Sequence, residues 1–270
     1  MTLSIGIIGG GYVGSATALF GCDKVQVFIW DSDPKRRIPR DCQPNDIIAC
    51  DLIFICVPTP CSEDGSCNVS IVESVLKEFR SLSPEPLDVV IRSTVPPFTS
   101  KRLGTAFMPE FLTEKNWRED VRTRSDWIVG VPQNEHGRRI QKKIETLLQY
   151  SAEAGKIAGS NTNVVLPEEA ELAKYVRNCF LSTKVAFFNE IYRLCERTQV
   201  NYEKIRELTG HDPRIGTSHM QVPGHDGLFG FGGTCFPKDL SALRAVYREF
   251  QVDSPVMDAV HRRNLDDRKE

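Results

Sequence analysis

A cysteine that could act as a nucleophile lies in the glycine-rich run GFGGTCFPKD, residues 230–239. The glycines let the backbone pass close to a ligand, and Pro237 is expected to begin a helix, which places Cys235 at a helix N-terminus. The helix dipole and Lys238 would both lower the pKa of the Cys235 thiol and favour the thiolate. Asp239 could orient a proton or a water molecule. The run predicts covalent catalysis, and the alternative is a buried structural cysteine beside a flexible loop.

A second glycine-rich run, GGGYVG at residues 9–14, stands between an apolar segment and an expected helix. Gly9 permits a tight turn, Gly11 lets the backbone approach a pyrophosphate, and Gly14 permits close packing of helix and strand. Asp31 ends the second expected strand, where a carboxylate can bind the adenosine ribose and repel a 2′-phosphate. The pattern predicts dinucleotide binding and favours NAD over NADP, against the alternative of a plain glycine turn. Three basic residues could still accommodate a phosphate: Lys35, Arg36 and Arg37.

Two pairs of polar residues have helical spacing. Lys174 and Asn178 are one helical turn apart and share a face of a long expected helix. Glu110 and Glu114 have the same spacing, and Glu110 follows Pro109 at a strand end, a common place for catalytic groups in parallel sheets. The first pair predicts a lined cleft, and the second predicts a catalytic group at a strand end. The alternatives are a solvated lysine and a surface pair of glutamates.

The elements that must position these residues alternate between strands and helices in the first half of the chain. The expected strands are rich in β-branched and aromatic residues, and they are Ser4–Ile8, Val25–Asp31, Leu52–Pro58, Val89–Ser93, Thr105–Met108 and Trp127–Val131. The expected helices are residues 12–21, 69–80 and 134–150. This alternation predicts an α/β fold with a Rossmann-like, doubly wound parallel sheet.

The second half predicts a mainly helical domain with a long central helix. Pro167-Glu168-Glu169 is a helix start, because proline suits the first turn and acidic residues suit the positive end of the dipole. The expected elements are a helix at 168–198, a helix at 202–208, a loop at 210–234 and a helix at 237–249. We therefore expect an NAD-binding domain at 1–166 and a helical domain at 167–270, which carries the nucleophile.

The run around Cys235 resembles the nucleophile motif of the UDP-glucose/GDP-mannose dehydrogenase family. Further motifs follow in order along nearly all of the chain: residues 9–14 (GGGYVG), 57–60 (VPTP), 93–97 (STVPP), 109–114 (PEFLTE), 171–178 (ELAKYVRN) and 212–216 (DPRIG). The ordered set is far more specific than any one of its members.

The resemblance implies a role for each matched position. It implies cofactor contacts from Gly9, Gly11, Tyr12, Val13, Gly14, Asp31, Arg36, Val57, Pro58, Thr59, Ser93, Thr94, Glu114 and Lys238. It implies substrate contacts from Glu110, Phe111, Leu112, Lys174, Asn178, Arg214, Phe231 and Gly232. It implies catalytic roles for Cys235, Lys174, Asn178, Asp239, Glu110 and Thr94, with no metal.

The chemistry that the resemblance implies is a four-electron oxidation of a nucleotide sugar from primary alcohol to uronate. The alcohol would lose a proton to Asp239 through water, or to Lys174, and a hydride to NAD. Cys235 would attack the aldehyde, and a second hydride transfer would leave a thioester, which Glu110, helped by Thr94, would hydrolyse with water. UDP-glucose is the first expectation for the substrate, and a UDP-N-acetylhexosamine or GDP-mannose stays open.

Two other classes of protein compete with this interpretation. One is a non-catalytic NAD-binding or assembly module, against which the joint presence of all the catalytic residues argues. The other is a two-electron β-hydroxyacid dehydrogenase, which shares the two-domain plan and has no need of a nucleophilic cysteine.

The sequence departs from the family at three places. The chain ends about thirty residues after Asp239, whereas the family usually continues with a nucleotide-sugar-binding domain. We expect a short form in which another chain supplies that domain, or two domains bind the substrate, or full activity is lost. The segment between Asp31 and Asp51 is shorter than in the family, and the loop at 222–228, with His225, is longer.

The composition of the chain limits the classes of partner and the cellular location that we expect. A net charge of −2 does not favour nucleic acid, and no apolar run approaches a membrane span. The N-terminus carries no signal-peptide pattern, so we expect a cytoplasmic protein. The nine cysteines include no CxxC pair, which leaves a metal cluster at Cys56, Cys61 and Cys67 as a remote alternative to plain thiols. Apolar residues around the helix at 168–198 predict a homodimer, which the resemblance also implies, and the alternative is burial of this helix within one chain.

Overall fold

The structure is a computed structural model that describes residues 2–113 and 115–269. Glu114, which the resemblance assigned to the cofactor, lies outside the described residues. The chain divides into two compact units: Met1–Pro60 with Asn68–Lys174, and Cys61–Cys67 with Tyr175–Glu270.

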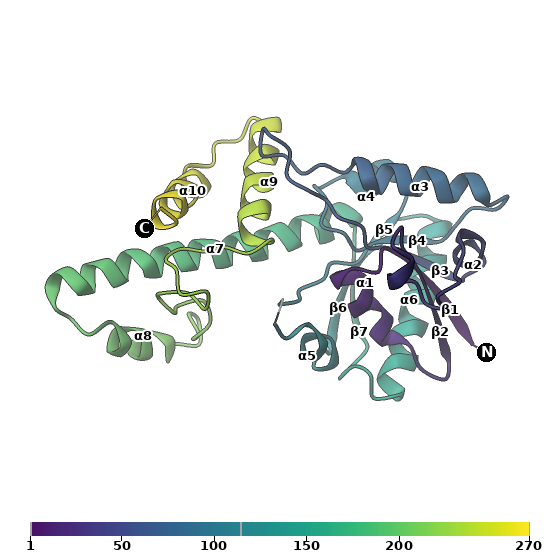
Figure 1. Cartoon of the computed structure of the whole chain (residues 1–270), viewed down its shortest axis with the longest axis horizontal. Helices are drawn as coiled ribbons and strands as arrows, with labels where there is room; N and C mark the ends of the chain where they lie inside the picture. The colour runs from purple at the N-terminus through teal and green to yellow at the C-terminus, as the bar shows by residue number, and fades with distance from the viewer. Residues whose placement is uncertain (1, 114, 270) are drawn as a thin grey trace. The chain divides into compact units, whose positions relative to one another are not determined.

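The first unit contains a seven-stranded sheet (Figure 1). Its strands are β1 Leu3–Ile8, β2 Val25–Trp30, β3 Leu52–Ile55, β4 Val89–Ile91, β5 Ala106–Phe107, β6 Asp126–Gly130 and β7 Asn161–Val165. Their order is β2-β1-β3-β4-β5-β6-β7. The Rossmann-like, doubly wound parallel sheet is confirmed, with one exception: β6 pairs antiparallel with β5, although it pairs parallel with β7.

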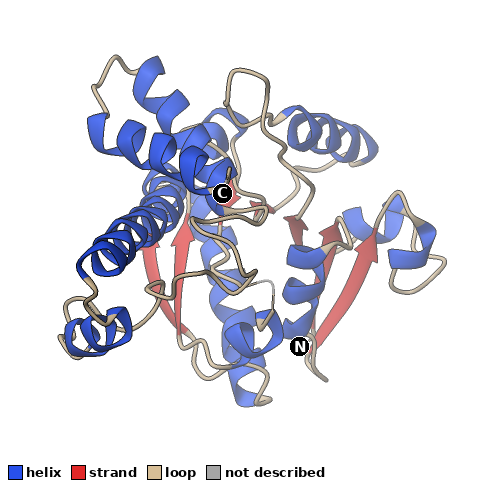
Figure 2. Ribbon diagram, turned by 60° about the vertical axis from the view of Figure 1, so that its left-hand side comes forward, coloured by secondary structure: helices blue, strands red, loops and turns tan. Residues whose placement is uncertain are grey.

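Helices pack on both faces of this sheet, as Figure 2 shows in blue and red. They are α1 Tyr12–Thr17, α2 Pro44–Ile48, α3 Ser70–Leu82, α4 Thr99–Leu103, α5 Trp117–Arg122 and α6 Glu135–Glu153, with 3₁₀ turns at Ala18–Phe20 and Pro34–Arg36. Leu52 and Phe54 of β3 pack into one hydrophobic cluster with α1, α5 and α6. Ile53 and Ile55 pack into a second cluster with α2 and α3, as the two-residue period of a strand requires.

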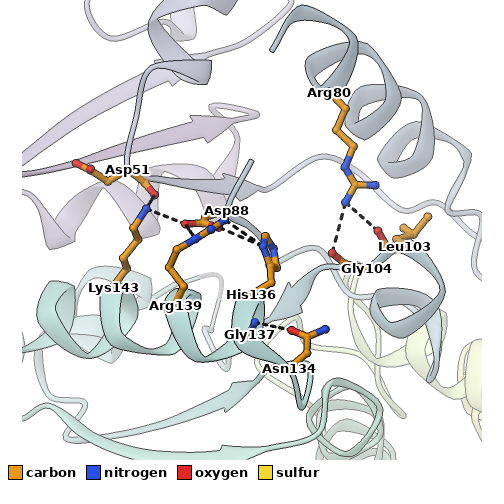
Figure 3. A network of polar contacts seen from close by, with 10 residues as sticks. All are labelled: Asp51, Arg80, Asp88, Leu103, Gly104, Asn134, His136, Gly137, Arg139 and Lys143. Atoms are coloured by element: carbon orange, nitrogen blue, oxygen red, sulfur yellow. Dashed lines mark hydrogen bonds and ion pairs between the residues drawn. The ribbon is translucent and has the colours of Figure 1, made fainter. Parts of the chain in front are cut away.

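A buried carboxylate ties the sheet to α6. The side chain of Asp88, just before β4, is only 4% exposed, and it accepts from Arg139 Nη2 at 2.6 Å and from Lys143 Nζ at 2.7 Å. Figure 3 shows both cations reaching Asp88 from α6, with His136 beside them. Burial acts to raise the pKa of the Asp88 carboxyl, but the two cations outweigh it and hold the pKa below its usual value.

The second unit is mainly helical. Its helices are α7 Pro167–Thr198, which begins in the first unit, α8 Tyr202–Gly210, α9 Phe236–Glu249 and α10 Pro255–Asp267. The predicted long helix is confirmed, and the Glu169 carboxylate caps its start by accepting from the Leu166 amide at 2.7 Å. Phe188, Tyr202 and Met220 form the centre of a hydrophobic cluster that joins α7, α8 and the loop after α8.

Two features, membrane-spanning helices and metal-binding groups, can be tested among the described residues. No helix within residues 2–113 and 115–269 combines the length and the apolar character needed to cross a membrane. In the same ranges, no group of three or more His, Cys, Asp or Glu side chains is placed to hold a metal ion.

Candidate functional site

The glycine turn after β1 has the shape that a dinucleotide phosphate requires. A Cβ on Gly14 would lie 1.9 Å from the Gly9 carbonyl oxygen, and one on Gly9, whose φ is +100°, would lie 2.6 Å from the Cys56 oxygen. A Cβ on Gly11 would meet no described atom within 4 Å. Gly9 and Gly14 are therefore required by packing, whereas Gly11 keeps a space open at the start of α1, where a diphosphate fits.

Asp31 lies beside this turn, directly after β2. Its Oδ2 accepts from the Gly10 amide at 2.7 Å, and its Oδ1 accepts from the Asp33 amide at 2.8 Å. Each carboxylate oxygen keeps capacity for a further hydrogen bond, such as one from a ribose hydroxyl. Arg36 is exposed and lies 3.8 Å from the Asp33 carboxylate. The glycine turn and Asp31 together fit NAD.

The ends of β3 and β4 are joined by side-chain hydrogen bonds. The Thr59 hydroxyl donates to the Thr94 carbonyl at 2.7 Å, and the Ser93 hydroxyl donates to the Val57 carbonyl at 2.6 Å. The structure thus brings together the residues at 57–59 and 93–94 that the resemblance assigned to the cofactor, Pro58 among them. They lie at the carboxyl edge of the parallel strands, where ligands bind in such sheets.

The segment that follows β5 is held against the start of α1. The Tyr12 hydroxyl donates to the Thr113 carbonyl, and the Tyr12 ring meets the Trp117 ring edge to face at 5.8 Å. Val13 packs into the core beneath α1, and Leu112 packs against the same cluster. Tyr12 therefore connects the glycine turn with the segment assigned to the substrate.

Glu110 and Lys174 form a buried ion pair. Lys174 Nζ donates to Glu110 Oε1 at 2.7 Å and to the Glu110 carbonyl at 2.6 Å, and the two side chains are 7% and 4% exposed for Glu110 and Lys174. The Leu112 amide donates to Glu110 Oε2 at 2.8 Å, and Lys174 Nζ lies 5.5 Å from the centre of the Phe111 ring. Burial acts to raise the pKa of the Glu110 carboxyl, but Lys174 and the Leu112 amide hold it below its usual value. The carboxylate is thus ionised at neutral pH.

Arg92 belongs to this cluster and was missed by the sequence analysis. It is 2% exposed, its guanidinium lies 5.7 Å from the centre of the Phe20 ring, and its charge helps to lower the pKa of Glu110. Burial lowers the pKa of Arg92 itself, which Cys56 and Glu110 oppose. The sequence did contain a signal for Arg92: it is a cation that directly follows the apolar residues 89–91. These residues form a strand that is buried on both of its faces, where an unpaired cation is rare.

The second unit contains a separate buried cluster around Asp239. Asn178 Nδ2 donates to Asp239 Oδ2 at 2.6 Å, and Lys238 Nζ donates to Asp239 Oδ1 at 2.5 Å. Asp239 is 1% exposed. Burial acts to lower the pKa of Lys238, but Asp239, followed by the thiols of Cys67 and Cys235, raises it above its usual value. Lys238, assigned to the cofactor by resemblance, is here the counter-ion of Asp239.

Cys235 occupies the N-cap position of α9, with Phe236 and Pro237 in the first turn. Its Sγ lies 3.8 Å from the Thr234 hydroxyl, and the residue is half-buried. The helix dipole and the nearby Lys238 both stabilise a thiolate at this position. The geometry suits a nucleophile that solvent or a substrate can reach.

Three residues that the resemblance assigned to the substrate belong to loops of the second unit. The amide of Phe231 donates to Asn264 Oδ1 at 2.7 Å, and a Cβ on Gly232 would lie 2.5 Å from Arg268 Nη2. The Arg214 side chain is 87% exposed and pairs with Asp212 at 2.5 Å. The loop before Cys235 is thus anchored by residues of α10 and its end, an anchor that the sequence analysis did not predict.

A cavity of about 920 Å³ in the first unit lies at the other edge of the sheet. Its lining comes from the segments before β4 and β5 and after β6 and β7, and it includes Arg80, Lys101, Glu85, Glu168 and His136. The predicted site residues Glu110 and Lys174 are not part of this lining. The positive and negative side chains in the lining nearly balance. The cavity therefore has no excess of positive charge that would favour binding of the phosphates of a cofactor.

Two domain models of one family match the chain. They are the NAD binding domain of the UDP-glucose/GDP-mannose dehydrogenase family, over residues 41–149, and the central domain of the same family, over residues 168–266. UDP-glucose 6-dehydrogenase of Pseudomonas aeruginosa is 35% identical over 233 residues, which are 79% of this chain and 48% of that protein. The chain spans about half the length of the curated relatives that it matches.

Solved structures share the fold. A UDP-glucose dehydrogenase from Pyrobaculum islandicum superposes with a TM-score of 0.81 at 26% identity, covering 98% of this chain and 68% of that one. The 3-hydroxyisobutyrate dehydrogenase of Mycobacterium tuberculosis superposes with a TM-score of 0.74 at 13% identity, covering 97% of this chain and 92% of that one. The second likeness is one of fold alone.

Proposed function

The chain belongs to the UDP-glucose/GDP-mannose dehydrogenase family, and we propose that it oxidises the primary alcohol of a nucleotide sugar to a carboxylate with NAD. The observation that carries the proposal is Cys235 at the N-terminus of α9, beside the ion pair of Lys238 with the buried Asp239. UDP-glucose is the proposed substrate, because the curated relatives are UDP-glucose 6-dehydrogenases.

The first oxidation makes an aldehyde. The glycine turn and Asp31 would hold NAD, which would supply the acceptor for the hydride of the alcohol carbon. Asp239 accepts the alcohol proton through a water molecule, and Asn178 orients the Asp239 carboxylate by its 2.6 Å hydrogen bond. Lys174 and Asn178, one helical turn apart on α7, stabilise the charge that develops on the substrate oxygen.

The second oxidation needs Cys235. The thiolate attacks the aldehyde carbon and forms a thiohemiacetal, and transfer of its hydride to a second NAD, with loss of the hydroxyl proton, would leave a thioester. A thiolate suits this step because it is both a good nucleophile and a good leaving group. In this scheme Lys238 favours the thiolate before the attack.

Hydrolysis of the thioester needs an activated water molecule. Glu110 serves as the base, because its lowered pKa keeps it ionised at neutral pH. Thr94, whose carbonyl is fixed by Thr59, holds the water in this proposal. Water attacks the thioester carbon, the carbon–sulfur bond breaks, and the carboxylate leaves with Cys235 restored as a thiol.

A two-electron hydroxyacid dehydrogenase is the second candidate, because a 3-hydroxyisobutyrate dehydrogenase shares the fold. The run at 230–239 argues against it, since that reaction forms no covalent intermediate. The test is to mix the full chain with NAD and a panel led by UDP-glucose, with GDP-mannose, a UDP-N-acetylhexosamine and, separately, the hydroxyacid 3-hydroxyisobutyrate, and to follow NADH and product mass. We expect two NADH per carboxylate, lost in Cys235→Ser. One NADH per molecule of hydroxyacid would support the second candidate, and no NADH while NAD binds would support a non-catalytic module.

We also propose a homodimer through α7. Val176, Phe180, Phe187 and Leu194 are 54%, 65%, 54% and 58% exposed, and their spacing of four, seven and seven residues places them along one stripe of the helix. A stripe of this kind is self-complementary in a two-fold dimer. A cytoplasmic location agrees with nine cysteines that are all thiols in the structure.

A further inference from the structure

Cys61 and Cys67 face each other across a short hairpin of the second unit. They form an isolated antiparallel bridge, and Gly65, whose φ is +85°, closes the turn between them. On the turn side of the pair, the Ser62 amide donates to the Ser66 carbonyl at 2.8 Å. The two cysteines are therefore held in register by the backbone.

The hydrogen bonds also define the type of pair. On the open side, the Asn68 amide donates to the Pro60 carbonyl at 2.8 Å. Because hydrogen bonds flank the pair on both sides and neither cysteine exchanges them with the other, Cys61 and Cys67 form a non-hydrogen-bonded pair. In such pairs the Cα atoms lie about 4.5 Å apart, within the range of roughly 4.4–6.8 Å that a disulfide spans.

The two thiols differ in access. Cys61 is exposed, whereas Cys67 is buried, with 8% of its surface accessible. A reagent in solution therefore reaches Cys61 first, and Cys67 is placed to react with whatever forms on the sulfur of Cys61. This asymmetry is the arrangement of an attacking and a resolving cysteine.

Cys67 also lies near two titratable side chains of the same unit. Its thiol interacts electrostatically with Lys238 and with Tyr175. The hairpin packs along α9, because Arg248 Nη2 donates to the Asp64 carbonyl at 2.9 Å and a Cβ on Gly65 would meet Ser241 at 3.7 Å.

We propose that Cys61 and Cys67 are a redox-active pair that forms a reversible intramolecular disulfide by exchange with a low-molecular-weight disulfide. The Cys61 thiolate attacks one sulfur of the small disulfide, forms a mixed disulfide and releases one small thiolate. Cys67, as thiolate, then attacks the Cys61 sulfur and releases the second small thiolate. The two cysteines are oxidised by two electrons in total, the small disulfide is reduced to two thiols, and the oxidation of a nucleotide sugar is not involved.

The test uses the full chain, reduced and then treated with oxidised glutathione, quenched with N-ethylmaleimide and mapped by mass spectrometry. We expect a peptide in which Cys61 and Cys67 are joined, two hydrogen atoms lighter than the dithiol, and its full reversal by dithiothreitol. In Cys67→Ser we expect a glutathione adduct to persist on Cys61, roughly tenfold above its level in the parent chain, because no nearby thiol displaces it. Cys50→Ser, a half-buried cysteine of the first unit, is the matched control and should leave the disulfide unchanged.

Three results would overturn the proposal. The first is a glutathione adduct on Cys61 that persists in the parent chain, and the second is a disulfide that joins Cys67 to Cys235. The third is complete alkylation of Cys61 and Cys67 by N-ethylmaleimide after the treatment with oxidised glutathione, which would show that both had remained free thiols. Circular dichroism of Cys67→Ser checks that the variant is folded, and Cys61→Ser, at an exposed position, repeats the test and should abolish the disulfide.

Discussion

Glu171 is a fully buried acid at the start of α7, and its ionisation should make the stability of the first unit depend on pH. Its Oε1 accepts from the Ser100 amide at 2.8 Å, while its Oε2 has no hydrogen-bond partner in the described part of the chain. Burial raises the pKa of the Glu171 carboxyl to about 7, although hydrogen bonds from Ser100 and Phe98 oppose the rise. The perturbation that tests this is Glu171→Gln, which removes the titration and keeps the shape.

The sign and the magnitude follow from the two pKa values. In the unfolded chain the carboxyl loses its proton near its ordinary value of 4.5, and in the folded chain it does so at about 7. Between these pH values only the folded chain holds the proton, so the free energy of unfolding falls as pH rises through this window. With about 1.4 kcal/mol per pKa unit, the loss between pH 5 and pH 8 is about 2.5 kcal/mol. Any constant cost of the buried amide in Glu171→Gln cancels from this difference.

The assay is urea unfolding followed by tryptophan fluorescence from pH 5 to pH 8. It reports on the first unit, because Trp30, Trp117 and Trp127 all lie there. We expect the parent chain to lose about 2.5 kcal/mol relative to Glu171→Gln across this range. Glu119→Gln is the control, because the Glu119 side chain is 64% exposed. Parallel curves for the parent chain and Glu171→Gln would refute the reasoning.

Three further predictions have defined outcomes. Asp88→Ala should lower the free energy of unfolding by about 2 kcal/mol at pH 7. Because the pKa of Asp88 is lowered in the folded chain, the stabilisation that Asp88 gives should be lost as pH falls below about 4, which urea titrations measure. Gly11→Ala should keep the melting temperature but weaken NAD binding at least about tenfold in calorimetry, whereas Gly14→Ala should lower the melting temperature, because its Cβ would meet the Gly9 oxygen at 1.9 Å; equal effects would contradict this. If the proposed α7 homodimer forms, Phe180→Asp should convert it to a monomer in analytical ultracentrifugation, and Leu208→Asp, at a 68% exposed position of α8, should not.

Local patterns were sufficient to predict the glycine turn and the long helix. Gly9 and Gly14 are constrained by contacts with segments close to β1, and the start of α7 carries its own cap in Glu169. The strand β7 was missed because its sequence, NTNVV, is largely polar and half exposed at the sheet edge. Helix α10 was missed because its residues are mostly polar, which leaves a weak helical pattern.

The contacts within each cluster were beyond the reach of the sequence alone. Lys174 meets Glu110 across 64 positions of the chain, and Asn178 meets Asp239 across 61. Helical spacing predicted that Lys174 and Asn178 share a face, but which carboxylate each would meet depends on how distant elements pack. The antiparallel pairing of β6 with β5 is a similar case, since strand-forming residues do not by themselves determine the direction of a strand in its sheet.

The most direct test of the central claim is to trap the acyl-enzyme in Glu110→Gln. The variant chain is mixed with NAD and UDP-glucose in a single turnover, and intact mass and peptide mapping follow the protein while absorbance follows NADH. If Cys235 carries the oxidised sugar and Glu110 activates the water, two NADH should form per chain, and Cys235 should retain a uronyl thioester that the parent chain releases. Two results together would contradict the account. One is that Glu110→Gln forms two NADH and releases free carboxylate while Cys235 stays unmodified, and the other is that Cys235→Ser still produces the carboxylate.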